Sequence, residues 1–579
     1  MQAQQTDLSP LLQFRLGVLA SNTFDLLLDL IPAAAARHGI ALEIETSAYD
    51  QVVQEALDPG SIINRSRCDA VLVAVDHRWF GLERLRVENP AAHVAAAVQQ
   101  LRCIIDALRA SGGAPTILQT VPVPPLQLFG SFDRRLPGTI RFMLDETNRA
   151  IGDLAADTGS YLLDVAAMAE RIGTDLWFSP VHWHAYKLPF SPECFPAYAD
   201  LLGRLLGAIR GRTRKCLILD LDNTLWGGAI GDDGCEGIQL GPGGAAGEAY
   251  LAVQQCALEL RERGIILAVC SKNTDEVARR PFREHPEMVL REKHFAAFNA
   301  NWLDKPANID AIARKLNLGL DAMVVLDDNP AERAQIRAAL PMVAVPELPR
   351  DASWYPWYLT AAGYFEAVAY SAEDGKRAES YVADAERTEV LSKTRDLGDY
   401  LSALEMVLRF APFDASNRPR IVQLVNKTNQ FNLTTRRYTE HEIREIERDP
   451  QMYTLQVRLE DKFGDLGMIG VIICSKREAD WHIDTWLMSC RVLGRRVEEA
   501  MLAALINHAR NCGVIGLIGT YVPTSKNTMV SSHYSKLGFE EIGCGTNRFR
   551  LDLARYVEPC LPFKSEHAVY AETPTRRVS

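Results

Sequence analysis

LILDLDNTLWGG, residues 217–228, is the stretch of sequence that decides the fold of this chain. Four apolar residues at 216–219 run into Asp220 and Asp222, which predicts a buried parallel strand that ends in two carboxylates. Side chains two residues apart in an extended segment point the same way, so both carboxylates can face one ligand. Ligands of open α/β sheets bind outside the carboxyl ends of the strands. Two carboxylates at a strand tip are costly unless a cation joins them, so we expect a site for chemistry here.

The DxDxT pattern alone is also compatible with a helix cap or a turn. Three later stretches favour the first interpretation: IILAVC (265–270) ends in Ser271, Lys305 lies in NWLDKPANI, and AMVVL (322–326) ends in Asp327 and Asp328. The order of carboxylates, hydroxyl, lysine and carboxylates resembles the four motifs of the haloacid dehalogenase (HAD) superfamily of phosphotransferases. Such a motif set is far more specific than any one of its parts.

This resemblance implies a role for each residue. Asp220 would be the nucleophile that forms an aspartyl-phosphate, and Asp222 the acid/base. Thr224 would fix the turn. Ser271 would donate a hydrogen bond to a phosphoryl oxygen and Lys305 would neutralise its charge, although a lysine is more often a surface cation. Hard oxygen ligands favour Mg²⁺, and the expected metal-ligating residues are Asp220, Asp222, Asp327 and Asp328.

Length and composition limit the classes of protein that remain. The chain has 579 residues, enough for three or four domains, with 47% hydrophobic and 24% charged residues. A net charge of −11 argues against general nucleic-acid binding. The 12 cysteines include no CxxC pair and no zinc spacing, which favours reduced thiols and a cytoplasmic protein. No signal peptide and no apolar run long enough to span a membrane is recognisable.

Residues 1–205 are expected to form a first, doubly wound α/β domain, because apolar strand-like runs alternate with amphipathic helical stretches. The order is similar to that of SGNH hydrolases, with Ser21 after the first strand and His182 and His184 late in the domain. The usual glycine-aspartate-serine is absent around Ser21, and Ser179 stands where an aspartate would precede His182. We therefore expect a binding or docking domain without catalytic activity, since function must be argued from the site.

The second domain, residues 206–350, carries the four motifs. About twenty residues separate Thr224 from the helix expected near Gly247, and about thirty separate Ser271 from Lys305. Neither stretch can hold an independent cap domain, which needs about 50 residues. GDDGCEGIQLGPGG (231–244) is expected to be a glycine-rich loop. An HAD domain without a cap leaves its site open, which suits either a substrate carried on a macromolecule or a second domain that acts as a lid.

Residues 351–400 are expected to be a helical connector, 401–560 a third α/β domain, and 561–579 a C-terminal tail. The third domain resembles the GNAT acyltransferase fold, whose signature is a strand, then R/QxxGxG/A, then a helix that holds a pyrophosphate. Arg491, Gly494 and Arg496 stand in those places, although Arg496 replaces a small residue and puts ordinary coenzyme A binding in doubt. Asn527 and Tyr534 resemble the later cofactor-binding motif.

Cys490 follows the expected central strand of this third domain, where the acyl thioester lies in such folds. Nearby arginines and a helix N-terminus lower the pKa of a thiol and favour the thiolate. The alternative is a buried cysteine that acts as a small hydrophobe. Cys270, beside Ser271, is a second candidate nucleophile.

The whole combination, with DLDNTLWGG, VCSKN, LDDNPAER, NKTNQFNLTTRR, FGDLG and SCRVLGR, resembles the FkbH-like family over nearly the full chain. The fold class is therefore expected to be multidomain α/β, with SGNH-like, capless HAD and GNAT-like domains. The resemblance implies a glyceryltransferase/phosphatase of polyketide biosynthesis. It would take a unit from 1,3-bisphosphoglycerate, remove the phosphate, and load the product as a thioester on a phosphopantetheinylated acyl carrier protein.

A carrier protein is typically acidic, so docking needs a local basic surface. Arg436, Arg437, Arg495 and Arg496 are candidates, unless they form intramolecular ion pairs, which are common. Three other functions remain open on the sequence: a magnesium phosphatase of a small metabolite with structural flanking domains, a scaffold that recruits carriers, and a coenzyme A-dependent acetyltransferase.

Overall fold

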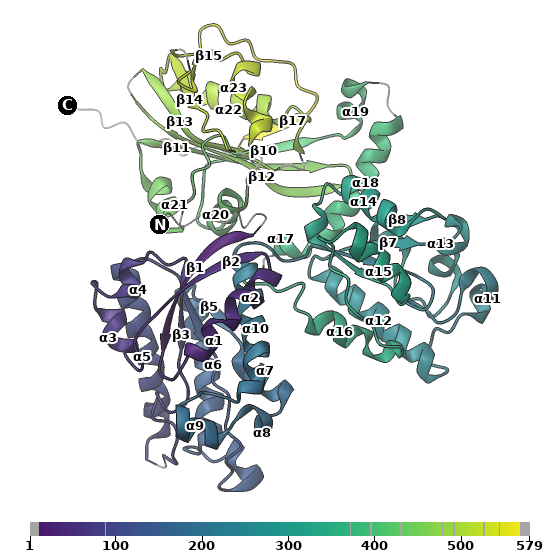
Figure 1. Ribbon diagram of the computed structural model, residues 1–579. Helices are drawn as coiled ribbons and strands as arrows, with labels where there is room; N and C mark the ends of the chain where they lie inside the picture. The colour runs from purple at the N-terminus through teal and green to yellow at the C-terminus, as the bar shows by residue number, and fades with distance from the viewer. Residues whose placement is uncertain are drawn as a thin grey trace, which may run out of the picture. The chain divides into compact units, whose positions relative to one another are not determined.

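The computed structural model describes residues 11–567, except residues 87, 371, 394–395, 429–430, 439, 478, 490–491, 525–526 and 544. The chain forms two compact units. The first contains residues 1–260, 267–291 and 298–372, and the second contains residues 261–266, 292–297 and 373–579. Two sheets belong to the first unit and one large sheet to the second (Figure 1). The chain is thus a multidomain α/β protein.

The N-terminal part contains a five-stranded parallel sheet in the order β2-β1-β3-β4-β5. Its strands are β1 (Leu12–Ala20), β2 (Ile40–Thr46), β3 (Ala70–Ala74), β4 (Thr116–Gln119) and β5 (Tyr161–Leu163). Its helices are α1 (Asp25–Leu28), α2 (Leu30–Arg37), α3 (Val52–Leu57), α4 (Ile62–Arg65), α5 (Pro90–Ser111), α6 (Ile140–Thr158), α7 (Val165–Ile172), α8 (Thr174–Trp177), α9 (Pro180–Tyr186) and α10 (Phe195–Ile209). Every residue of β3 is buried, as expected for a strand covered on both faces.

Two separate cores cover the two faces of this sheet. Residues of α2, α7 and α10 form one core, and residues of α3, α5 and α6 form the other. The predicted doubly wound arrangement is therefore present. β1, β3 and β4 all end at the same edge of the sheet. Folds of this kind bind their ligands at that edge.

The second sheet of the first unit has the order β8-β7-β6-β9. Its strands are β6 (Cys216–Leu219), β7 (Ile266–Ser271), β8 (Phe295–Ala300) and β9 (Met323–Leu326), and its helices are α11 (Ile230–Gly237), α12 (Ala245–Glu262), α13 (Asp275–Glu284), α14 (Lys305–Lys315) and α15 (Pro330–Ala339). The sequence did not predict β8, and α11 replaces part of the expected loop at 231–244. The segment consists of two short helical turns separated at Gly234, whose positive φ of 69° is a conformation that glycine adopts readily. α11 is far too small to be a cap domain.

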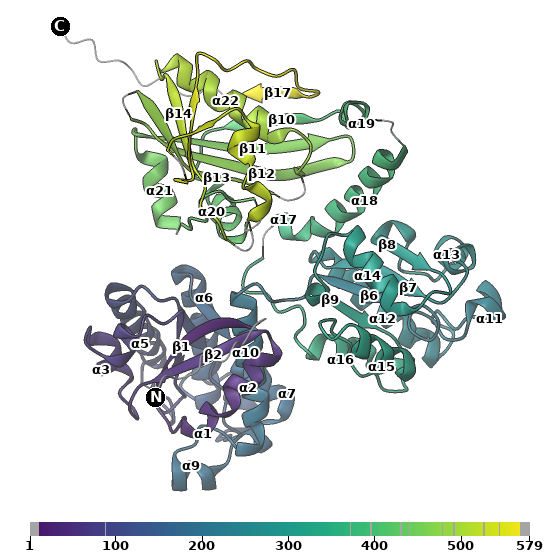
Figure 2. The same ribbon diagram turned by 45° about the horizontal axis from the view of Figure 1, so that its top comes forward.

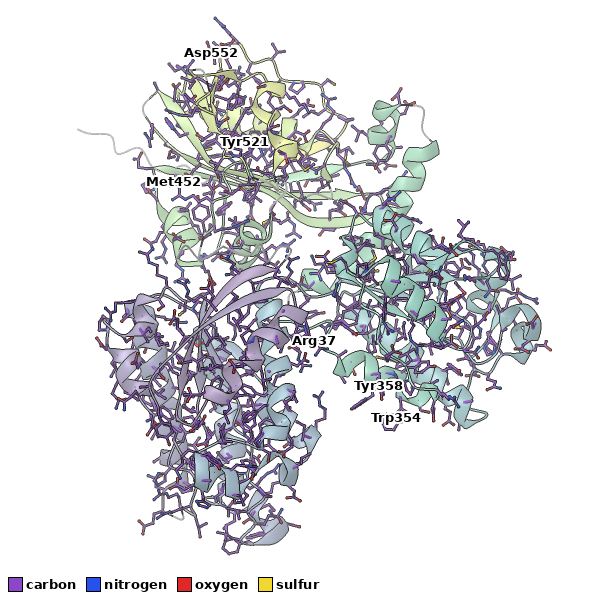
Figure 3. The ribbon with its side chains drawn as sticks, viewed as in Figure 1. Arg37, Trp354, Tyr358, Met452, Tyr521 and Asp552 are labelled. Atoms are coloured by element: carbon purple, nitrogen blue, oxygen red, sulfur yellow. The ribbon has the colours of Figure 1, made fainter. Side chains whose placement is uncertain are left out.

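The second unit is built on an eight-stranded mixed sheet in the order β15-β16-β14-β13-β12-β11-β10-β17. Its strands are β10 (Val407–Ala411), β11 (Met452–Asp461), β12 (Gly464–Ser475), β13 (Asp480–Met488), β14 (Gly516–Thr520), β15 (Glu540–Glu541), β16 (Arg548–Asp552) and β17 (Lys564–His567). Met452 and Asp552, at the start of β11 and the end of β16, are labelled in Figure 3. The expected tail at 561–579 is corrected in part, because β17 pairs with β10 at the edge of the sheet.

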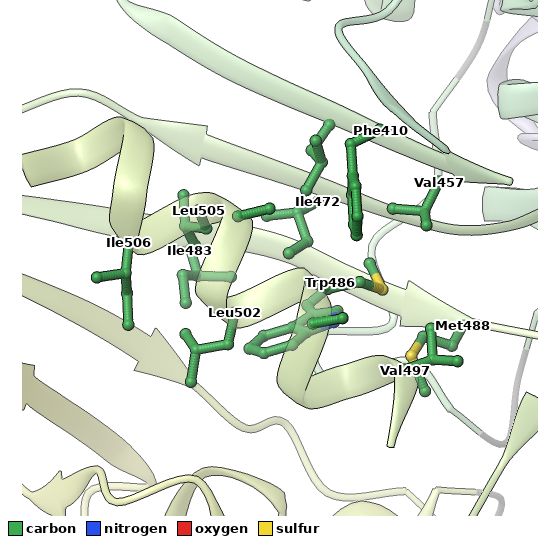
Figure 4. Packing of buried hydrophobic residues seen from close by; sticks show 14 of the residues in the cluster. Phe410, Val457, Ile472, Ile483, Trp486, Met488, Val497, Leu502, Leu505 and Ile506 are labelled. Atoms are coloured by element: carbon green, nitrogen blue, oxygen red, sulfur yellow. The ribbon is translucent and has the colours of Figure 1, made fainter. Parts of the chain in front are cut away.

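The first unit ends with η5 (Ala352–Trp354) and α16 (Tyr355–Ala361), and α17 (Ala372–Gly375) lies at the boundary between the units. The helices of the second unit are α18 (Arg377–Lys393), α19 (Leu397–Ala403), α20 (Arg418–Lys427), α21 (Glu440–Arg448), α22 (Val497–Asn511) and α23 (His533–Lys536). Val497, Leu502 and Leu505 of α22 pack against Trp486 and its neighbours on β13 (Figure 4). This strand, turn and helix is the GNAT-like element that the sequence predicted.

β13 and β14 separate part of the way along their length. They pair in parallel from Asp480 with Gly516 to Ile483 with Gly519, and β13 then continues to Met488 paired with β12 but no longer with β14. The segment around Leu433 occupies the space between them: the Leu433 amide donates to the Trp486 carbonyl (3.2 Å), and the Val522 amide donates to the Leu433 carbonyl (2.8 Å). Part of the NKTNQFNLTTRR motif therefore completes the sheet at this point.

A buried ionic network connects α18 to the sheet of the second unit. Arg387 donates from Nε and Nη2 to the two carboxylate oxygens of Asp461 (2.7 and 2.6 Å). Arg495 reaches the same carboxylate (3.4 Å) and lies 3.6 Å from Asp384. The side chains of Arg387 and Asp461 are 3% and 0% exposed. The connector helix is thus attached by charges that have no access to water.

We predict that Arg387→Met destabilises the second unit by about 3 kcal/mol or more, because it leaves the buried Asp461 carboxylate with a weaker partner. The matched control is Arg409→Met, which removes an arginine whose bonds to Glu460 and Glu566 are solvent-exposed and should cost less than about 1 kcal/mol. Chemical unfolding followed by circular dichroism measures both. Equal losses for the two variants would contradict the prediction.

Candidate active site

The four predicted motifs of the first unit lie at strand ends and helix starts of one sheet. Asp220 follows β6 and Asp327 follows β9, and the parallel pairing of Leu219 with Leu326 sets these two aspartates side by side. Ser271 is the last residue of β7, and Lys305 is the first residue of α14. The apolar strands are buried, so the polar residues that follow them are held at the edge of a rigid sheet.

Lys305 is the centre of this cluster. Its Nζ lies 3.0 Å from Asp220 Oδ1 and 2.6 Å from Asp327 Oδ2, and it also contacts Glu332. The lysine side chain is 2% exposed. The alternative of a surface cation is therefore wrong for Lys305: its ammonium is surrounded by carboxylates.

Burial and the neighbouring charges shift the pKa values of the groups in the cluster. Burial, reinforced by the charge of Asp327, raises the pKa of Asp220 to about 7 although Lys305 acts in the opposite direction. Burial likewise raises the pKa of Asp328 to about 6. For Lys305 burial acts to lower the pKa, but the carboxylates of Asp220 and Asp327 outweigh it and raise the pKa. The cluster thus contains more negative charge than one lysine offsets.

Three of the carboxylates form a group that could hold a metal ion. One oxygen from each of Asp220, Asp327 and Asp328 lies within 4.8 Å of the other two. Such a set of hard oxygen donors suits a divalent cation such as Mg²⁺. The excess of buried carboxylates over cations fits the same conclusion, because a bound cation favours their charged forms.

Asp222, which we also expected among the metal-ligating residues, has its carboxylate bound elsewhere. Its Oδ1 accepts hydrogen bonds from Trp226 Nε1 and the Ile230 amide (3.0 Å each), and its Oδ2 accepts one from Asn273 Nδ2 (2.9 Å). Asp222 therefore lies outside the group of three carboxylates, in an orientation fixed by three donors. This placement is compatible with its predicted acid/base role.

Two residues of this site were not predicted from the sequence. Asn273, two positions after Ser271, orients Asp222. Glu332, on the first turn of α15, accepts from Lys305 and lies 3.1 Å from Lys272 Nζ, so it connects the two lysines. The sequence LDDNPAE could have revealed Glu332, because it places this residue one helical turn after the Asn329 cap of α15.

Thr224 and Ser271 are both buried next to the cluster. Thr224 Oγ1 accepts from the amide of Asp328 (3.3 Å), so it ties the loop after β6 to the loop after β9. Ser271 Oγ lies 3.5 Å from Asn273 Nδ2. Cys270, the second candidate nucleophile, is inside the sheet, where burial raises the pKa of its thiol to about 12. A thiol in that state does not supply a thiolate at neutral pH.

Two candidate acyl-transfer residues of the second unit, Cys490 and Arg491, lie outside the residues that the structure describes. Gly494 has a positive φ of 77° in the turn before α22. Arg496 caps α22 and donates to both carboxylate oxygens of Glu499 (2.9 and 2.7 Å). Two acids, Glu498 and Glu499, occupy the first turn of α22. This helix N-terminus is therefore unfavourable for a pyrophosphate.

Asn527 and Tyr534, the other expected cofactor-binding residues, are buried. Asn527 Nδ2 donates to the carbonyls of Asn432 (3.0 Å) and Val522 (2.9 Å), and its Oδ1 accepts from the Thr524 amide (2.7 Å). The hydroxyl of Tyr521, labelled in Figure 3, lies 3.4 Å from the same Oδ1. Asn527 thus has a structural role at the separated strands.

The four arginines that we considered for carrier docking all have intramolecular partners. Arg436 pairs with Asp484 (2.6 Å) and Arg496 with Glu499. Arg437 donates to the carbonyls of Val425 and Thr428, and Arg495 belongs to the buried network. We therefore interpret these four arginines as partners of groups within the chain, and not as a free basic surface.

In the N-terminal part, Ser21 follows β1 as expected. Its Oγ has no hydrogen-bond partner, and neither has Nδ1 of His182. His184 is exposed on α9. No serine–histidine hydrogen bond of a hydrolase is therefore formed among these residues. Their function stays a prediction.

One solved structure resembles most of the first unit. It is the N-terminal part of the protein BF1531 from Bacteroides fragilis, which contains a phosphatase domain and is complexed with Mg. The identity is 30%, the match covers 62% of this chain and 96% of that chain, and the TM-score is 0.59. A family described as "FkbH, N-terminal domain" matches residues 15–204. Comparison with curated proteins gives no match.

The fold and the carboxylate–lysine site define an HAD-type phosphatase. The chain belongs to the FkbH-like family.

Solved structures of GNAT acetyltransferases match about a quarter of this chain. The ribosomal-protein-S18-alanine N-acetyltransferase from Escherichia coli is 13% identical, with a TM-score of 0.20, over 26% of this chain and 98% of its own. A spermidine N-acetyltransferase from Vibrio cholerae is 14% identical, with a TM-score of 0.21, over 26% of this chain and 97% of its own.

None of the helices in the described part of the chain has both the length and the hydrophobicity needed to cross a membrane.

We predict that Glu332→Gln lowers kcat for phosphoester hydrolysis on the order of 10-fold or more, because residues that orient the groups of a metal site have effects of that size. KM should change little, since Glu332 acts through Lys305. Glu276→Gln is the control: Glu276 is an exposed helix residue paired with Arg283, and its variant should hydrolyse at the normal rate. An unchanged kcat in Glu332→Gln would show that Lys305 needs no third partner.

Proposed function

We propose that this protein removes phosphate from a phosphoglyceryl group and loads the resulting glyceryl unit on an acyl carrier protein as a thioester. The observation that supports the phosphatase half best is the buried Lys305 between Asp220 and Asp327. A lysine in this position can neutralise a phosphoryl oxygen while Asp220 faces the phosphorus. The resemblance to the FkbH-like family supports 1,3-bisphosphoglycerate as the donor.

Mg²⁺ is the metal that this proposal requires, and Asp220, Asp327 and Asp328 would hold it. When bound, it would draw negative charge from the phosphoryl oxygens and so favour attack at phosphorus. The structural relative from Bacteroides fragilis was complexed with Mg, which supports this assignment.

The chain's own residues account for the proton and phosphoryl transfers. A carboxylate oxygen of Asp220 forms a bond to phosphorus while the bond from phosphorus to the ester oxygen breaks, and Asp222 gives its proton to the leaving alkoxide. Water then attacks the aspartyl-phosphate, Asp222 takes a proton from that water, and phosphate leaves with Asp220 regenerated. Asn273 and Trp226 keep Asp222 in place for both steps.

The acyl half of the proposal assigns the thiolate to Cys490. An acyl phosphate is already activated, so attack of the thiolate on the carbonyl carbon forms a C–S bond and expels phosphate without ATP. The carrier's phosphopantetheine thiolate then attacks this thioester, and Cys490 leaves as the thiolate. The intramolecular pairing of Arg496 with Glu499 favours a carrier-bound arm over free coenzyme A.

The test mixes the protein with Mg²⁺, 1,3-bisphosphoglycerate and a holo-acyl carrier protein, and follows both proteins by intact mass spectrometry. We expect Asp220→Asn to lower phosphate release from the phosphomonoester by at least about 1,000-fold, because the nucleophile is lost. Its acyl adduct should still form and should retain the phosphate. Cys490→Ala should form no adduct.

The two halves can fail separately. Phosphate release without any acylated carrier would favour a magnesium phosphatase of a small metabolite, the alternative function. An adduct that persists in Cys490→Ala would exclude the cysteine. Equal activity of Asp220→Asn and the parent would exclude the phosphatase.

We further predict that a chelator separates the two activities. EDTA should abolish phosphate release from the phosphomonoester, because the carboxylate group loses its cation, while the adduct on Cys490 still forms. Readdition of Mg²⁺ should restore the release. Persistent hydrolysis after exhaustive chelation would contradict the assignment of the carboxylate group as a metal site.

A further inference from the structure

Four loops surround the carboxylate–lysine site of the first unit, one after each strand of its second sheet. They are residues 220–229 after β6, 271–274 after β7, 301–304 after β8 and 327–329 after β9. The side chains of Asp220, Ser271, Lys305 and Asp327 are buried between them. A phosphoryl group that reaches these side chains therefore leaves the organic part of its ester at the loops.

The loop after β8 exposes two large apolar side chains. β8 is the outer strand of this sheet, next to β7 (Figure 2). Trp302 is 73% exposed and Leu303 is 63% exposed, and no aromatic side chain in the described part of the chain is more exposed than Trp302. The exposed residues of the other three loops are all polar: Asn223, Thr274 and Asn329. Apolar contact with an ester is thus available from the loop after β8.

Both ends of this loop are attached to the reactive residues. At its start, the Asn301 amide donates to the Ser271 carbonyl (3.2 Å). At its end, Lys305 begins α14, and Sγ of Cys270 lies 3.9 Å from the Lys305 carbonyl oxygen. The Cα atoms of Trp302 and Lys305 are at most about 11 Å apart, because three residues of chain span no more than that. Trp302 therefore lies within reach of a substrate bound at Lys305.

Hydrogen bonds of Asn301 fix the shape of the loop. Its Oδ1 accepts from the Leu303 amide (3.0 Å) and from Asn308 Nδ2 (2.8 Å), and its Nδ2 donates to Asn308 Oδ1 (3.0 Å). Asn308 is buried on α14. The loop thus holds Trp302 and Leu303 exposed in a preformed conformation. It loses little conformational entropy when a ligand covers them, which favours binding.

The charges of the loops disfavour a second anionic group on the ester. Asp304, at the end of the loop after β8, is exposed. Lys272 is the one cation in the sequence of the four loops, and it pairs with Glu332 (3.1 Å). A carboxylate beside the phosphate would therefore meet the like charge of Asp304 and a cation that already has a partner.

We propose that Trp302 and Leu303 contact the organic part of the phosphomonoester, and that the phosphatase site prefers esters with an uncharged, apolar body over free phosphorylated C3 acids. This inference rests on the proposed function for the phosphatase activity itself. A phosphoglyceryl group fits the preference once its carboxyl carbon is bound as a thioester, because the carboxylate charge is then gone.

The first experiment compares two alkyl phosphates with similar leaving groups, 4-phenylbutyl phosphate and ethyl phosphate, as substrates of the full chain with Mg²⁺. The wild type should hydrolyse the phenylbutyl ester with a kcat/KM at least about tenfold higher, because its apolar body is removed from water against Trp302. Trp302→Ala should lower this ratio by about tenfold, chiefly through KM. Trp302→Phe should keep most of it, since an aromatic ring remains.

Met342→Ala is the matched control. Met342 is a large apolar residue of the same unit and is 42% exposed. Its carbonyl accepts from Arg214, which precedes β6 and so lies at the opposite edge of the sheet. This variant should keep the ratio of the wild type. Thermal unfolding shows whether each variant is folded.

Binding is measured apart from turnover by calorimetry with 4-phenylbutylphosphonate, which cannot be hydrolysed. Its Kd should rise about tenfold in Trp302→Ala, a loss typical of a tryptophan that contributes strongly to binding. Met342→Ala should bind it as the wild type does. An equal Kd in Trp302→Ala and the wild type would overturn the role of Trp302.

The second experiment compares 3-phosphoglycerate with its methyl ester, which lacks the carboxylate charge. The wild type should hydrolyse the ester with a kcat/KM about fivefold higher or more, and Asp304→Asn should narrow this preference, because it removes a like charge. Asp310→Asn is the control: Asp310 lies further along α14 and pairs with Arg314. It should keep the full preference.

No preference of the wild type for the phenylbutyl ester or for the methyl ester would overturn the proposed substrate class. Equal preferences in Trp302→Ala and Met342→Ala would do the same for the contact surface. If none of the four phosphates is hydrolysed, the proposed phosphatase function fails, and binding of the phosphonate still decides the role of Trp302.

Discussion

The phosphatase site depends on one constraint: carboxylates of like charge must be held close together in a buried position. Asp220, Asp327 and Asp328 would repel one another if Lys305 did not lie among them, and a buried lysine would be equally costly without those acids. The pairing of β6 with β9 fixes the two strand ends, and α14 brings the lysine to them. Glu332 and Thr224 then hold the lysine and the two loops in register. The site is thus an electrostatic balance that a cation can complete.

The other two sheets treat buried polarity differently. In the second unit a complete network around Arg387 and Asp461 leaves no oxygen of that carboxylate free, and it serves attachment. In the N-terminal sheet Ser21 Oγ, Asn22 Oδ1 and His77 Nδ1 are buried without a hydrogen-bond partner. Buried polar groups of one chain therefore differ in how they are satisfied: around a buried cation, in a closed ion network, or not within the protein. The burial of a polar residue does not by itself say which of these applies.

Sequence alone predicted the parts of the fold that follow from apolar runs. The strands before Asp220 and Asp327 are continuous hydrophobic stretches, so their tips could be located to within a residue or two. The partners of those tips were harder to predict. Glu332 and Asn273 are ordinary polar residues, and only the three-dimensional proximity of Lys305 and Asp222 makes them part of the site. The burial of the arginines could not be predicted either. No local sequence pattern reveals that Arg495 is buried while Arg134 is exposed.

The last strand has a consequence for how the protein is made. β17 pairs with β10, and the bond from Arg409 to Glu566 spans 157 positions of sequence. During synthesis the outer side of β10 therefore stays uncovered until residues 564–567 leave the ribosome. An open strand edge is a template for pairing with another chain, and the nascent second unit passes through such a state before its final strand arrives. The edge of β10 is therefore closed only after residues 564–567 have been synthesised.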